Sequence, residues 1–219
     1  MNVITATNLT IPKPSQAWTQ QMRASLAAFA KPGDSRTAGI GVDNWPGPEA
    51  VHCLYSVGLQ AIINAKALDA FDSPTVWRYM AGSHENGATA AVCWVTPELH
   101  GKVVATARAA EAADVLASTA LLNKLSEVMN PNNQYEIRVL RVPALCVEAF
   151  WLKSTTPGGD VLVPYGLVQG ASNQIKLPGG GRLNKNQAYP VADFLKIATE
   201  AAKKRLAAEK KPLASKTGA

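Results

Sequence analysis

The chain has 219 residues, of which 47% are hydrophobic and 17% charged, so it can bury the core of one large domain, and disorder throughout is excluded. No apolar run approaches the ~20 residues of a membrane-spanning helix, and the first residues lack the basic-then-apolar pattern of a secretory signal, so we expect a cytoplasmic protein. The formal net charge is +6, but residues 196–219 hold seven Lys or Arg against two Glu, which gives +5, so a basic surface spread over the folded body is not expected.

The first segment, residues 1–14, is expected to be an extended arm, because Pro12 and Pro14 disfavour a helix there. Ser15 can cap a helix that ends near Lys31. Its apolar stripe is formed by residues at four- and three-residue steps: Trp18, Met22, Leu26 and Phe29. Residues 34–47 carry four glycines or prolines and are predicted to form a loop.

A second helix is predicted to begin near Pro48 and to continue to about Ile63, because apolar residues recur there at helical spacing. Cys53, Val57 and Ala61 make its other faces apolar as well. A helix that is apolar on most sides is usually buried, so we expect this one at the centre of the domain.

A β-hairpin is predicted next. Residues 75–82 and 89–99 are rich in β-branched and aromatic side chains and flank a turn that contains Asn86-Gly87. A long helix, rich in alanine and then in leucine, is expected from about Leu99 to Met129.

Three further strands are predicted within residues 135–154 and 159–168, with turns near Pro143 and Pro157. Their connections are too short for parallel pairing, so we expect an antiparallel meander. The segment LCVEAFWL is almost continuously apolar, which predicts that it forms the central strand of the meander.

The C-terminal part is predicted to be irregular from Gly166 to Tyr189 and then to form a helix from Pro190 to about Ala208. The expected fold is therefore α+β: an antiparallel sheet of about five strands, made of the hairpin and the meander, packed with four to five helices. We expect a single domain over residues 15–207 and a disordered basic tail over residues 208–219.

The glycine run Gly179-Gly180-Gly181, followed by Arg182 and Lys185, is a candidate anion-binding loop. Backbone N–H groups of successive glycines can surround an anion, and an arginine can add a bidentate contact. However, the run lacks both the Lys-Ser/Thr of a P-loop and the spaced glycines of a dinucleotide fingerprint. We therefore predict a solvent-exposed flexible connection, with contact of Arg182 and Lys185 to a partner surface as its alternative role.

Cys53 is the candidate nucleophile, because a thiol in the first turns of the predicted second helix would have its pKa lowered by the helix dipole. His84 and His100 are its candidate bases. Glu148 interrupts an apolar strand and is either a buried general acid or base, or a partner of Arg138 or Arg141 on the neighbouring strand, or solvent-facing. The competing interpretation of Cys53 is an ordinary core cysteine.

Metal and cofactor sites are not expected. The three histidines and three cysteines show none of the short paired spacings that zinc sites use. Cys53, Cys93 and Cys146 each have apolar neighbours, which predicts buried free thiols in a reducing compartment.

Two further features are candidates for contact with a partner. Trp45 is a large aromatic in a glycine- and proline-rich loop, and it is either a ligand platform, an interface anchor or a plug that packs the loop on the core. The basic C-terminal tail can contact nucleic acid or another anionic surface weakly, but no aromatic follows Phe194 to stack on single-stranded bases. A solvated end is expected, because a run of charge alone rarely specifies a partner.

The sequence favours a non-enzymatic binding protein or a structural subunit of a homo-oligomer or larger assembly, whose partner is itself or another protein. This hypothesis depends on the long predicted loops and on sheet edges that can pair with another chain. One alternative is a cysteine-dependent hydrolase that uses Cys53 with His84 or His100. The other is nucleic-acid binding through the basic tail.

Overall fold

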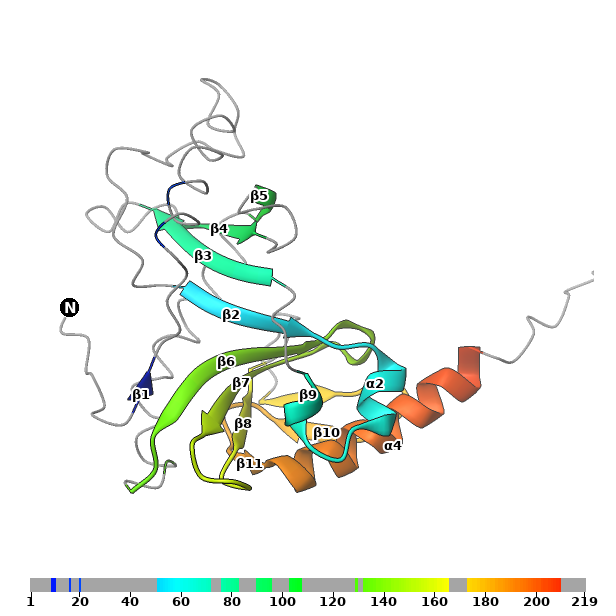
Figure 1. The fold of residues 1–219 in the computed structure, drawn as a ribbon. Coiled ribbons are helices and arrows are strands. Elements are labelled where there is room, and N and C mark those ends of the chain that lie inside the picture. Colours follow the sequence, from blue (N-terminus) through cyan, green and yellow to red (C-terminus); the bar gives the residue numbers. More distant parts are fainter. Residues whose placement is uncertain are drawn as a thin grey trace, which may run out of the picture.

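The computed structural model describes residues 9–10, 16, 20, 51–71, 76–82, 90–95, 103–107, 129, 132–165 and 173–209 (Figure 1). Of the first predicted helix, only Gln16 and Gln20 belong to this part of the chain, and both are helical. The loop at residues 34–47, the hairpin turn at Asn86-Gly87 and the tail beyond Glu209 lie outside it.

One mixed sheet forms the framework of the fold. Its nine strands run in the order β11-β8-β7-β6-β2-β3-β4-β5, with β1 paired to β6 beside β2. Seven of these strands are longer than two residues. The strands are β1 (Leu9–Thr10), β2 (Val51–Ser56), β3 (Val76–Gly82), β4 (Ala90–Val95), β5 (Val103–Ala107), β6 (Tyr135–Val142), β7 (Val147–Ser154), β8 (Val161–Pro164) and β11 (Tyr189–Pro190).

The α+β class is therefore confirmed, and so are both predicted strand groups. The prediction of an antiparallel sheet of about five strands is wrong, because β6 pairs parallel with both β1 and β2 and the sheet has more strands. Strands β3 and β4 pair antiparallel, as the hairpin prediction requires. Strands β6, β7 and β8 form the antiparallel meander, in which β7 is central and buried along nearly its whole length. The short 3-10 helix η4 (Pro143–Leu145) makes the first of its turns.

The prediction of a second, central helix is wrong over its first half. Residues Val51–Ser56 form β2, which pairs antiparallel with β3 and parallel with β6 and so joins the hairpin and the meander into one sheet. Only Leu59–Asn64 is helical, as α2, and the 3-10 helix η2 (Leu68–Ala70) follows it. Cys53 and Leu54 are both buried although they point to opposite faces. A strand that is apolar on both faces has the same continuous pattern as a buried helix.

The expected helix from Leu99 to Met129 is also wrong at its beginning, because Val103–Ala107 forms β5 on the edge of the sheet. The sequence of β5, VVATA, contains β-branched residues that favour strands, and the alanines around it obscured this signal. Residues 108–128 lie outside the described part of the chain.

The segment from residue 173 to residue 190 is ordered, which corrects the prediction that it is irregular. It contains a two-stranded antiparallel hairpin of β9 (Gln174–Lys176) and β10 (Arg182–Asn184), followed by β11. The last helix, α4 (Val191–Glu209), is confirmed, and its buried face consists of Phe194, Leu195, Ala198, Ala201 and Ala202. The described residues thus contain two α-helices longer than one turn, fewer than the four to five expected.

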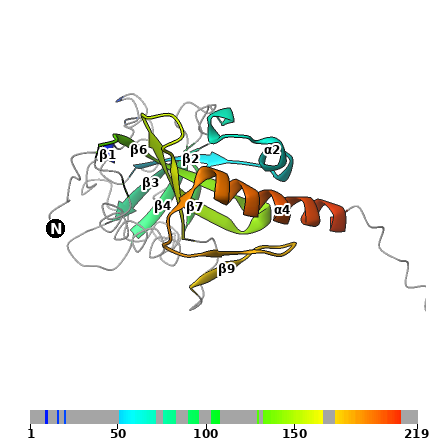
Figure 2. The same ribbon diagram turned by 90° about the horizontal axis from the view of Figure 1, so that it is seen from below.

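Apolar clusters cover both faces of the meander. On one face, α2, α4 and the inner side of the β9–β10 hairpin pack against Leu140, Ala149 and Trp151. In Figure 2, α4 lies between α2 and β9. On the other face, Val139, Phe150 and Val163 pack with Met129. This arrangement explains why LCVEAFWL is continuously apolar, since β7 contributes to both clusters.

Candidate functional site

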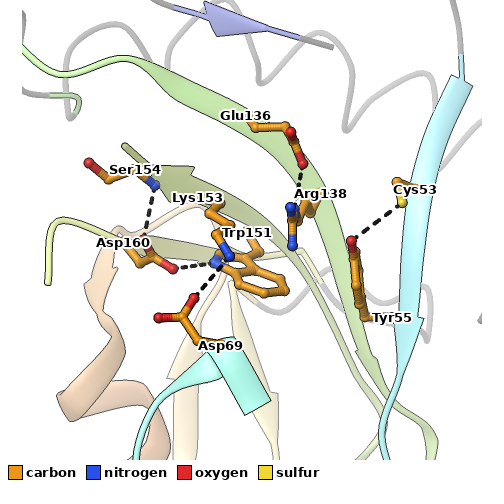
Figure 3. Close-up of polar contacts among 9 residues, drawn as sticks. All are labelled: Cys53, Tyr55, Asp69, Glu136, Arg138, Trp151, Lys153, Ser154 and Asp160. Atoms are coloured by element: carbon orange, nitrogen blue, oxygen red, sulfur yellow. Dashed lines mark hydrogen bonds and ion pairs between the residues drawn. The ribbon is translucent and has the colours of Figure 1, made fainter. Parts of the chain in front are cut away.

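Polar and aromatic side chains from β2, β6, β7, η2 and the turn between β7 and β8 meet on the sheet face that also carries α2 and α4, together with the backbone N–H of Ser154 (Figure 3). We call them the Arg138 cluster. Its members are Cys53, Tyr55, Asp69, Glu136, Arg138, Trp151, Lys153, Ser154 and Asp160.

Arg138 is at the centre of this cluster. Its guanidinium carbon lies 5.0 Å from the ring centroid of Tyr55 and 5.0 Å from that of Trp151, which are cation–π distances. Its Nε donates a hydrogen bond to Glu136 Oε1 at 2.6 Å, and its side chain is 15% exposed. Register explains the stack, because Arg138 lies directly opposite Trp151 on β7 and Glu136 is two residues away on the same face. The guanidinium is therefore fixed and its charge is compensated.

Trp151 is held by an acidic turn residue. Its ring is fully buried, and its indole Nε1 donates to Asp160 Oδ2 at 2.7 Å. The other carboxylate oxygen of Asp160 accepts from the backbone N–H of Ser154 at 2.9 Å. One carboxylate thus satisfies two donors and closes the turn between β7 and β8.

Lys153 connects β7 to η2. Its Nζ donates to Asp69 Oδ1 at 2.9 Å and lies 5.7 Å from the Trp151 ring centroid. The Asp69 side chain is 73% exposed, so solvent screens this pair and its contribution to stability is at most about 1 kcal/mol.

Cys53 does not have the environment that the sequence predicted for a nucleophile. It lies in a strand, not at a helix N-terminus, and its thiol donates to Tyr55 Oη at 3.7 Å. Burial raises the pKa of the Cys53 thiol, and burial also raises the pKa of Tyr55. Both groups are therefore protonated at neutral pH, and neither is prepared to act as a nucleophile or a base.

We expect Cys53 to be inert toward an alkylating reagent in the native protein and to react only after unfolding, because the reagent needs an exposed thiolate. Cys146, which is partly exposed in a turn with a φ of 56°, is expected to react in the native state. Timed iodoacetamide labelling with peptide mass spectrometry measures each cysteine separately. Native labelling of Cys53 as fast as that of Cys146 would contradict this and would restore the hydrolase hypothesis.

Glu148 is buried on the opposite face of the sheet, at 4% exposure. It lies directly across from Arg141, one of its two predicted neighbours, whereas Arg138 faces the other side. The Tyr165 hydroxyl donates to Glu148 Oε1 at 2.5 Å. Glu148 is therefore not solvent-facing; it lies in register with Arg141 and accepts a hydrogen bond from Tyr165, and its role as a general acid or base stays a prediction.

The three glycines form the turn of the β9–β10 hairpin; they are solvent-exposed, as predicted, but they adopt a hydrogen-bonded turn instead of the irregular connection that was expected. Gly179, Gly180 and Gly181 have φ values of +95°, +102° and +94°, which favour glycine. Gly180 N–H donates to Leu177 O at 2.9 Å, and Leu177 N–H donates to Gly181 O at 3.1 Å. The turn lies against α4, because a Cβ on Gly179 would be 2.5 Å from Ala201 O.

The two basic residues of the glycine motif lie on and beyond this hairpin. Arg182 is exposed on β10, and its Nη1 donates to Gln174 Oε1 at 3.2 Å on β9. Lys185 is partly exposed, and its backbone N–H donates to Asn173 O at 2.7 Å. The glycines thus form the hairpin turn, Arg182 begins the strand that follows it, and Lys185 comes directly after that strand.

His84, His100 and Trp45 lie outside the described residues, so their roles stay predictions. Sequence reasoning missed the Arg138 cluster. The two-residue spacings Glu136/Arg138 and Trp151/Lys153 are the available signal, since each pair must share one face of a strand.

The described part of the chain holds no group of three or more His, Cys, Asp or Glu placed to bind a metal ion. None of its helices has both the length and the apolar character needed to cross a membrane. Compared with protein-family models, with curated proteins and with solved structures, the chain matches none. A functional proposal must therefore be argued from the geometry of this chain.

Proposed function

We propose that this protein is a non-enzymatic assembly subunit whose copies pair with one another through strand β5. The main support for this proposal is the difference between the two edge strands of the sheet, β11 and β5. At one end, β11 is two residues long and includes Pro190, which has no N–H to offer to another strand. At the other end, β5 offers five residues without proline or charge.

Strand β5 carries no charge or proline that would protect the edge, although its ladder with β4 shifts register between Trp94 and Val95. Natural sheets block edge pairing with charged side chains, proline or very short edge strands, and VVATA has none of these. Within the described ranges, β4 is the one strand that pairs with β5, so β5 ends the sheet. Two copies of β5 that pair antiparallel about a two-fold axis would satisfy each other's backbone groups with identical surfaces.

The chemistry of the Arg138 cluster favours this proposal over the cysteine hydrolase. Its thiol and phenol are protonated by burial, and its central guanidinium is already paired with Glu136. These contacts stabilise the sheet and leave Cys53 without an activating group among the described residues.

Light scattering coupled to size exclusion, over a range of protein concentrations, tests the proposal. We expect the wild-type chain to elute as a dimer and Thr106→Lys to elute as a monomer, because a lysine on an edge strand disfavours pairing. A wild-type monomer at high concentration, or a dimer unaffected by Thr106→Lys, would contradict the proposal.

The matched control is Thr155→Lys, which adds the same charge at an exposed position in the turn after β7. This variant is expected to remain dimeric. Circular dichroism of both variants separates loss of pairing from loss of folding.

A further inference from the structure

We infer that the outer face of the β9–β10 hairpin and the adjoining surface of α4 bind the phosphate backbone of a double-stranded nucleic acid. The residues that would make the contact are Lys176, Arg182 and Lys204, which we call the hairpin patch. This inference does not depend on pairing through β5, and it is separate from contact by the C-terminal tail.

The hairpin has one buried and one exposed face. Ile175, Leu177 and Leu183 pack into the core, so the alternate residues of β9 and β10 point outward. On that outer face Lys176 lies directly opposite Arg182, and both are exposed. Two cations directly opposite in a sheet repel each other, and an anion bound between them would remove this repulsion.

A third cation, on α4, borders the glycine turn at the end of the hairpin. A Cβ on Gly180 would lie 3.8 Å from Lys204 Nζ, so this ammonium group borders the turn that connects the strands of Lys176 and Arg182. Arg205, the next residue on α4, is already paired with Glu209 at 3.0 Å and is not counted. The turn therefore joins the charges of the hairpin and of α4.

Acidic residues do little to neutralise this surface. The sequence contains no Asp or Glu between Asp160 and Asp193, so the hairpin itself has none. Glu200 is exposed one helical turn before Lys204. With Glu200 included, the three cations of the hairpin patch still give a net charge of +2.

The chemistry of the hairpin patch suits the phosphates of a duplex. Arginine offers a bidentate fork that matches phosphate, and lysine adds a point charge. The outer hairpin face carries Gln174, Lys176, Arg182 and Asn184, without an aromatic ring for base stacking, so contact with the backbone is expected instead of recognition of single-stranded bases. The turn residues, Pro178 to Gly181, lack the large apolar side chains that insert into a membrane surface.

The test measures binding of the full-length protein to a fluorescent random-sequence DNA duplex by anisotropy at several salt concentrations. We expect Lys176→Gln/Arg182→Gln/Lys204→Gln to weaken binding on the order of tenfold or more, because charge-assisted contacts are lost. The slope of log K against log salt should decrease by about 0.9 for each phosphate contact removed.

The control variant Lys66→Gln/Lys196→Gln/Lys203→Gln removes the same charge from exposed positions that do not belong to the hairpin patch, one after α2 and two on α4. It should retain near-wild-type affinity. Equal losses in the two variants would show a non-specific effect of net charge and would overturn the inference, as would no duplex binding by the wild type.

Two other anionic ligands test whether the partner is instead an acidic protein or a membrane. Polyglutamate and vesicles with anionic lipid are measured in the same buffer, and both should bind more weakly than the duplex. Stronger binding of either one, with the same dependence on the hairpin patch, would assign the surface to an acidic protein or a membrane and would overturn the proposal of a nucleic acid.

Discussion

Gly179→Ala is expected to lower the free energy of unfolding by about 3 kcal/mol. At a φ of +95°, the backbone conformation of a residue that has a Cβ costs on the order of 1 to 2 kcal/mol of folding free energy. In addition, its Cβ would lie 2.5 Å from Ala201 O and 3.0 Å from Arg205 N, which are backbone atoms of α4 that cannot rotate away. Relief of this overlap requires the hairpin or α4 to shift, with a further cost of about 1 to 3 kcal/mol.

The two neighbouring glycines provide matched controls. Gly180 and Gly181 have nearly the same φ as Gly179, but a Cβ on either would meet its nearest neighbour at 3.6 Å or more. Alanine at either position should therefore lower the free energy of unfolding only by the cost of the left-handed backbone, about 1 to 2 kcal/mol. Urea denaturation of the three variants measures the difference. Equal losses at all three positions would show that the turn does not press against α4.

Asp160→Ala is expected to destabilise the protein by about 2 to 3 kcal/mol. The substitution removes the acceptor of two N–H groups, one on the fully buried Trp151 ring and one on the backbone of Ser154. Hydrogen bonds to a charged acceptor contribute about 1.5 to 3 kcal/mol each, and solvent at the partly exposed Asp160 position offsets part of the loss.

Asp69→Ala is the control, because it removes a carboxylate of the same cluster that is exposed and pairs with Lys153 at the surface. Its expected cost is below about 1 kcal/mol. A double-mutant cycle of Asp160→Ala with Trp151→Phe isolates the indole contact, since phenylalanine has no N–H to leave unpaired. If Asp160→Ala costs no more than Asp69→Ala, the hydrogen bond to Trp151 does not contribute to stability.

The sequence predicted best the elements whose signals are local. The strands of the meander are bounded by proline and glycine turns, and α4 has a regular apolar face, so both were found close to their observed limits. The hairpin of β3 and β4 was found because Asn86-Gly87 lies between two strand-like segments.

The remaining elements depend on tertiary contacts that spacing does not reveal. Strand β2 has the pattern of a buried helix because the two apolar clusters bury both of its faces, with Cys53 and Tyr55 on one side and Leu54 on the other. Three consecutive glycines indicate freedom of the backbone, but the close approach of α4 is what fixes their conformation. The Arg138 cluster depends on the register of β6 with β7, which places Arg138 opposite Trp151 and which no single segment specifies.

The position of α2 has a consequence for the order of folding. Its Ile62 carbonyl accepts a hydrogen bond from Thr199 of α4, across a separation of 137 residues in the chain. β2, which immediately precedes α2, likewise completes its pairing only with β6. During synthesis, therefore, these early segments expose apolar surface until the last helix emerges, and such long-range closure slows folding. We expect nascent chains of this protein to need protection from aggregation until α4 has been made.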